Sequence, residues 1–123
     1  MLEFRKILEP DACRLAVEKS TPEIMTALET YLEQMQMFQG NREKFVNADL
    51  KFHEVICRST GNPLLEKSLH KVFQETRQNH EQMNELFGYD SGIHYHTQIL
   101  GCVQKQGMQM WPMILCMSIW MLP

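Results

Sequence analysis

The chain has 123 residues, of which 44% are hydrophobic and 22% charged, and its formal net charge is −3. This length suits a single domain, and the composition is that of a globular protein, which argues against a multidomain enzyme and against extended disorder. An acidic balance offers no attraction to a phosphate backbone, so we expect this chain alone to bind neither DNA nor an anionic membrane through charge. A role in reading DNA would require another domain.

The cysteines and the two ends of the chain favour a location in the reducing cytoplasm. The four cysteines lie far apart and form no CxxC pair: Cys13, Cys57, Cys102 and Cys116. The N-terminal MLEFRKILEP lacks the apolar core of a signal peptide. The uncharged stretch GMQMWPMILCMSIWMLP is shorter than the ~20 residues that a membrane-spanning helix needs, and it contains Pro112. We therefore expect no membrane anchor.

Apolar residues at helical spacing predict the first two helices. Residues 2–19 form an amphipathic pattern, in which Pro10 should kink the helix or split off its first turns. Thr21 followed by Pro22 is typical of an N-cap and the first position of a helix, and the apolar period then continues up to Gly40.

The same reasoning predicts three further helices. The third covers residues 41–59, and Asn62 with Pro63 begins a long helix of about 24 residues that ends before Gly88. A fifth helix covers residues 91–106, and no segment alternates as a strand would. Because the connections are short, we predict an all-α fold, an antiparallel helical bundle of about six helices.

One pair of side chains on the third helix could bind a metal ion. Asp49 and His53 are four residues apart, so a carboxylate and an imidazole lie on one face of the helix, within reach of a shared ion. Such pairs also arise by chance as surface hydrogen bonds. The neighbouring Phe52 suggests that this face is partly buried, where a histidine needs a partner.

The fifth predicted helix offers another histidine that could bind the same metal ion. Residues two apart on a helix diverge by about 200°, so only one of His94 and His96 can point inward. His96 shares the apolar stripe that follows it, and His94 is then on the surface. His70 and His80 fall on the polar side of the long predicted helix, and we assign them no function.

Other chemistries lack their motifs. No serine or cysteine stands in a recognisable nucleophile signature. The six glycines are isolated, so no phosphate-binding loop is indicated.

Four segments together resemble one family, the FadR C-terminal domain (FCD), which is the effector-binding half of GntR-type bacterial transcription regulators. Three strings occur in the family's order, D-x-x-F-H at 49–53, S-x-G-N-P at 59–63 and H-x-x-I-L at 96–100. The N-terminal segment FRKILEPDACRLAVEKST adds Arg5, Leu8, Glu9 and Ala16. The resemblance covers residues 1–107 as an FCD-like domain.

This resemblance implies a helical bundle with a divalent metal ion in a central cavity and a small carboxylic acid bound beside it. Asp49, His53 and His96 match three of the family's four metal ligands, and such a donor set suits zinc, nickel or manganese. Arg5 corresponds to an arginine of the first helix, which implies effector binding, although a solvated arginine is the alternative. Capture of the acid would modulate DNA binding by a winged-helix domain that this chain does not contain.

The chain departs from the family at its C-terminus. The fourth ligand, a histidine, would fall at position 118, where this chain has Ser118, so we expect a weakened metal site. Residues 108–123 form an atypical apolar tail with five methionines and both tryptophans. Read in the neighbouring frame with permitted codons, the segment from Gly107 can give N-A-D-V-A-H-D-I-M-Y-V-H-M-D, although its histidines depend on the codons chosen. We hypothesise a frameshifted C-terminus, which the coding DNA would decide.

Several functions remain open from the sequence. The apolar tail could pack on the bundle or join a second copy, and we expect a homodimer. Besides the sensing domain of a regulator, the residues allow a metal-free helical interaction or dimerisation module, in which Asp49 pairs with His53. They also allow a metal-dependent hydrolase, although Glu54 should point about 100° away from His53 and no other general base is evident. We expect that the chain is not an enzyme.

Overall fold

The computed structural model describes residues 11–12, 14–16, 18–19 and 21–104. Every regular element within these residues is a helix, which confirms the all-α prediction. Four helices have defined bounds: α2 (Pro22–Met37), α3 (Arg42–Ser59), α4 (Pro63–Glu75) and α5 (Arg77–Gln104). Before them, residues 11–12, 14–16 and 18 are helical, as predicted for this part of the first helix. Pro10, Arg5 and the tail 108–123 lie outside the described residues.

Side-chain caps begin three of the helices where the sequence predicts them. The Oγ1 atom of Thr21 accepts the N–H of Ile24 at 3.3 Å. Asn41 and Asn62 do the same for α3 and α4, and Asn62 accepts two N–H groups, each at 3.1 Å. Each cap satisfies a backbone donor that the first turn of a helix leaves without an internal partner, which explains why these three starts are local properties of the sequence.

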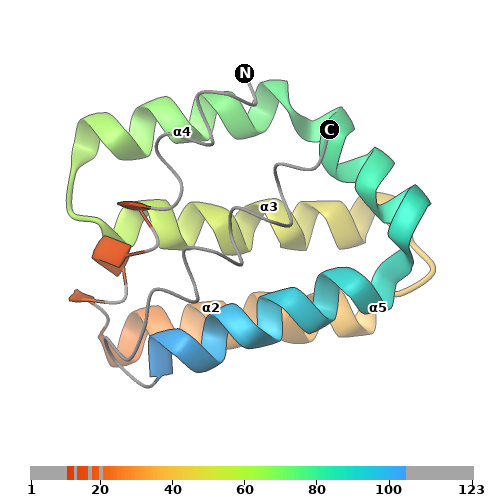
Figure 1. Ribbon diagram of the computed structural model, residues 1–123, viewed down its shortest axis with the longest axis horizontal. Coiled ribbons are helices and arrows are strands. Elements are labelled where there is room, and N and C mark those ends of the chain that lie inside the picture. The colour runs from red at the N-terminus through yellow and green to blue at the C-terminus, as the bar shows by residue number, and fades with distance from the viewer. Residues whose placement is uncertain (1–10, 13, 17, 20, 105–123) are drawn as a thin grey trace.

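Helix α3 lies at the centre of the fold. Helices α2, α4 and α5 all contact it, and α5 also contacts α2. Figure 1 shows α2 and α4 running antiparallel to α3, as the short connections predict. Helix α3 is therefore buried on several sides, and its buried residues include the polar Asp49 and His53.

The long helix predicted from residue 63 to the residue before Gly88 is wrong, because the helix is interrupted at Thr76. The hydroxyl of Thr76 donates to the carbonyl of Val72 at 2.8 Å, and its backbone N–H donates to the same oxygen at 2.9 Å. Thr26 and Thr97 make the same hydroxyl bond inside continuous helices, so this bond accompanies the break but does not by itself cause it. Helix α4 ends at Glu75, and α5 leaves in a new direction (Figure 1).

Helix α5 bends at Gly88, which agrees with the predicted end of one helix before this residue, although the next helical segment begins two residues before the predicted Ser91. Gly88 has φ 79° and ψ 177°, and helical structure resumes at Tyr89. This backbone region is essentially restricted to glycine. The segment before the bend, residues 77–87, and the segment after it, residues 89–104, thus approach α3 from different directions (Figure 1).

None of the helices within residues 21–104 combines the length and apolar character needed to cross a bilayer.

Candidate metal centre

Asp49 is the centre of a buried polar cluster. It lies in the middle of α3 and is only 3% exposed. One turn later, Nε2 of the buried His53 lies 3.3 Å from Oδ1 of Asp49. The helical spacing that predicts this pair is therefore confirmed, and the pair lies inside the protein rather than on its surface.

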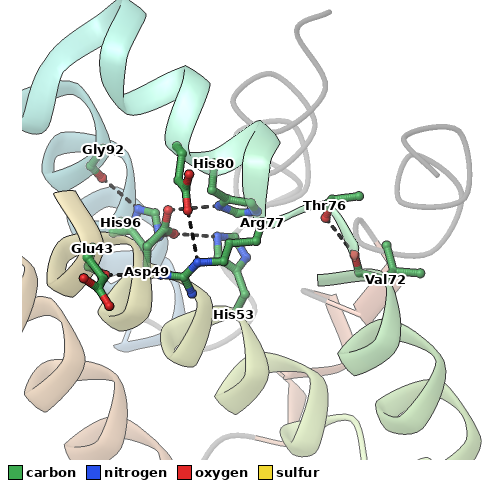
Figure 2. A network of polar contacts seen from close by, with 10 residues as sticks. Glu43, Asp49, His53, Val72, Thr76, Arg77, His80, Gly92 and His96 are labelled. Carbon is green, nitrogen blue, oxygen red and sulfur yellow. Dashed lines mark hydrogen bonds and ion pairs between the residues drawn. The ribbon is translucent and has the colours of Figure 1, made fainter. Parts of the chain in front are cut away.

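His96 reaches the same carboxylate oxygen from α5. Its Nε2 atom lies 2.8 Å from Oδ1 of Asp49, and its Nδ1 atom lies 2.7 Å from the carbonyl oxygen of Gly92 (Figure 2). The ring is fully buried and packs edge-on against Phe52, with 4.6 Å between the ring centroids. The predicted inward orientation of His96 is confirmed.

The prediction for His80 is wrong. This residue is 1% exposed, and its Nδ1 atom lies 3.0 Å from Oδ2 of Asp49. The break at Thr76 redirects the chain, so His80 on the first segment of α5 faces α3 instead of solvent (Figure 2). A signal was present in the sequence, because Phe73 and Thr76 precede His80 by seven and four residues, the spacing of one helical stripe.

The environment of Asp49 keeps its carboxyl group ionised. Burial alone would raise its pKa, because a charge is poorly solvated inside a protein. The charges of His80 and His96 and hydrogen bonds from His53 and His80 outweigh burial, and the pKa of Asp49 is lowered well below its usual value. Asp49 therefore offers two acceptor oxygens to the surrounding imidazoles.

This arrangement places both ring nitrogens of His96 against oxygen acceptors. A neutral imidazole has a single N–H, which the carbonyl of Gly92 can accept. Nε2 then needs either a second proton or a cation shared with Oδ1 of Asp49. The donor chemistry of the cluster thus fits a bound cation, and the bond to Gly92 would orient the ring for it.

The three predicted ligands also meet the spatial requirement of a metal site. The ligating atoms of Asp49, His53 and His96 all lie within 4.8 Å of one another, and all three residues are buried. Ligand atoms around a tetrahedral ion with bonds of about 2.1 Å lie about 3.4 Å apart. The 3.3 Å separation between Oδ1 and Nε2 of His53 is close to that value, whereas the 2.8 Å separation from Nε2 of His96 is a hydrogen-bond distance and would have to widen around an ion. One carboxylate and two imidazoles suit zinc, nickel or manganese.

His94 and His70 lie on the surface and not in this cluster. His94 is exposed, as predicted. His70 is half exposed and forms a 2.8 Å ion pair with Glu54, which confirms its surface position and shows that Glu54 is engaged elsewhere. Arg5 lies outside the described residues, so its predicted contact with an effector is a proposal below.

Comparison with known proteins shows the family of this chain. The FCD domain family matches residues 1–107. A galactonate operon transcriptional repressor of Escherichia coli (strain K12) is 34% identical over 67 residues, which are 54% of this chain and 29% of the repressor. The uncharacterized HTH-type transcriptional regulator YieP of the same organism is 36% identical over 66 residues, which are 52% of this chain and 29% of that regulator.

The matched part of this chain thus spans less than a third of the length of either relative. Both relatives are transcription regulators, which groups the chain with regulatory domains and not with enzymes. The match covers most of the chain, including Asp49, His53 and His96, and the chain belongs to the FCD domain family.

Proposed function

We propose that this chain is the effector-sensing domain of a GntR-type transcription regulator and that it holds a divalent metal ion through Asp49, His53 and His96. The observation that carries the proposal is the buried convergence of three ligating atoms from α3 and α5. Ionised Asp49 and a His96 ring oriented by Gly92 support the same assignment. The ion would provide a Lewis-acidic point at which a carboxylate group can bind.

The proposed effector is a small organic acid. Three protein ligands leave open positions on a divalent ion, and oxygen anions fill such positions readily. One relative is named for the galactonate operon, so galactonate is the first acid to test. We keep Arg5 as a proposed second contact for the acid, because a guanidinium binds carboxylates through two parallel hydrogen bonds.

The proposal includes the organisation of the chain. Residues 1–107 would form the sensing domain, and the apolar tail 108–123 would replace the last helix of the family, with loss of the fourth ligand and a weakened site. We further propose a cytoplasmic homodimer without a membrane partner. DNA would be bound by a separate domain, and effector capture would alter its affinity by shifting the packing of the helices.

Calorimetric titration tests the link between metal and acid. Galactonate is titrated into the protein after chelation and again after loading with Zn²⁺, with gluconate and an uncharged sugar as comparisons. We expect binding of an acid only in the loaded protein, and none in a His53→Ala variant. The His70→Ala variant is the matched control, because it removes an exposed imidazole that pairs with Glu54. Equal binding of the acid with and without metal would contradict the proposed role of the ion.

A further inference from the structure

The two carboxylate oxygens of Asp49 have different partners. Oδ1 faces Nε2 of both His53 and His96, at 3.3 and 2.8 Å. Oδ2 faces Nδ1 of His80 at 3.0 Å. The two predicted histidine ligands thus contact the same oxygen of Asp49. The other oxygen contacts His80, which is not among the predicted ligands.

His80 is well placed to hold that oxygen. Its side chain is fully buried, and its ring lies edge-on to those of His53 and Phe73, with centroids 5.6 and 6.4 Å away. A carboxylate oxygen accepts hydrogen bonds, so Nδ1 of His80, 3.0 Å from Oδ2, carries the donated N–H. The group of mutually close ligating atoms comprises Asp49, His53 and His96 without His80.

A carboxylate that is free to rotate can bind a metal ion through both oxygens or through either one of them. A hydrogen bond to one oxygen removes this freedom and directs the other at the ion. The first segment of α5 supplies that bond, while the second segment supplies His96 (Figure 2).

We propose that His80 is a positioning residue of the metal centre: its bond to Oδ2 makes Asp49 a ligand through Oδ1 alone. The inference rests on the proposed function, because it assumes that Asp49, His53 and His96 bind the ion. His80 acts through Asp49 and does not itself touch the metal.

The test compares three substitutions of His80. Asparagine carries an amide N–H at about the position of Nδ1, and glutamine carries the same amide one carbon further along. We expect His80→Asn to retain Zn²⁺ affinity close to that of the unaltered chain. His80→Gln and His80→Ala should lose affinity about 10- to 100-fold, the usual cost of removing a residue that orients a metal ligand. His70→Ala serves as the control for loss of an imidazole outside the cluster.

Two further readouts separate positioning from other roles. Circular dichroism and thermal melting establish whether each variant folds. If the alanine variant does not fold, the comparison of asparagine with glutamine still tests whether His80 positions Asp49. The visible absorption of bound Co²⁺ reports the number and type of ligands. We expect the same Co²⁺ spectrum for the unaltered chain and for His80→Asn, because His80 is no ligand.

Each alternative result has a distinct meaning. Unchanged Zn²⁺ affinity in all three variants would overturn the positioning role and leave the proposed metal site intact. A weaker, altered Co²⁺ spectrum in His80→Asn would also overturn it, because His80 would then be a direct ligand. Failure of the unaltered chain to bind Zn²⁺ or Co²⁺ would contradict the proposed function and this inference together.

Discussion

The Nε2 atom of His96 lies 2.8 Å from Oδ1 of Asp49, although 47 positions separate the two residues in the chain. Asp49 belongs to the central helix α3, and His96 belongs to the segment of α5 beyond the bend at Gly88. The contact exists only because α5 turns back along the bundle. The proposed metal centre therefore depends on the course of α5.

Acidification should release the metal before Asp49 is protonated. The pKa of Asp49 is depressed, so its contribution to stability is fully present above the unfolded value of about 3.9 and is lost only as the pH falls through the lower folded value. Metal ligation competes with protonation of imidazoles, whose reference pKa is about 6.5. We expect Zn²⁺ to dissociate between about pH 6.5 and 4 in a dialysis series. Retention of the metal down to pH 4 and release only below it would contradict the assigned histidine ligands.

Substitution of Gly88 should weaken both the fold and the metal site. An added Cβ would meet no heavy atom within 4 Å, so the cost of Gly88→Ala comes from the backbone conformation with φ 79°. We expect a loss of about 1–3 kcal/mol in the free energy of unfolding, measured by urea denaturation. We also expect a lower Zn²⁺ affinity, because the bend brings both segments of α5 to Asp49.

Gly101→Ala is the matched control for this prediction. Gly101 is helical, and its added Cβ would also meet nothing within 4 Å. A helical alanine is favoured over glycine by about 0.5–1 kcal/mol, so this variant should be slightly more stable and should bind metal normally. Equal effects of the two substitutions would argue against a special role for the bend.

Metal binding should restrain both segments of α5. His80 and His96 contact the same carboxylate from the two sides of Gly88. We expect addition of Zn²⁺ to slow amide hydrogen exchange in residues 77–87 and 89–104 more than in α2, which supplies no predicted ligand. Mass spectrometry of peptic peptides measures this difference. Slowing in residues 89–104 alone would show that the first segment is independent of the site.

The cap at Asn62 provides a test that separates stability from metal binding. Its side chain accepts two backbone N–H groups at the start of α4, which carries no predicted ligand. Asn62→Ala should lower the free energy of unfolding by about 1 kcal/mol, within the usual range for lost caps. Its Zn²⁺ affinity, measured by competition with a chromogenic chelator, should stay unchanged. A large loss of affinity would mean that metal binding follows overall stability and not the local geometry.

Local signals explain which parts of the fold were predictable. The starts of α2, α3 and α4 follow from the side chains of Thr21, Asn41 and Asn62, each of which binds N–H groups a few residues away. The pairing of Asp49 with His53 is equally local. The break at Thr76 was missed because the apolar pattern continues across it. The boundary at Gly88 was predicted, but a lone glycine does not reveal the direction of the bend.

The site was predicted in part for the same reason. The inward orientation of His96 follows from its apolar stripe, whereas its distance from Asp49 depends on how α5 turns. His80 was missed because it was assigned to the polar side of the long predicted helix. Its buried contact with Asp49 arises from tertiary structure, although the spacing from Phe73 contained a hint. Arg5 and the tail 108–123 stay predictions from the sequence alone.

The most direct test of the account is the metal content of the chain purified without an affinity tag. Plasma mass spectrometry is carried out after incubation with Zn²⁺ or Ni²⁺ and desalting, on the unaltered chain and on His96→Ala and His70→Ala. The account predicts close to one equivalent of metal in the unaltered chain and in His70→Ala, and little in His96→Ala. Absence of retained metal from the unaltered chain, or equal retention in His96→Ala, would contradict a metal centre at Asp49, His53 and His96.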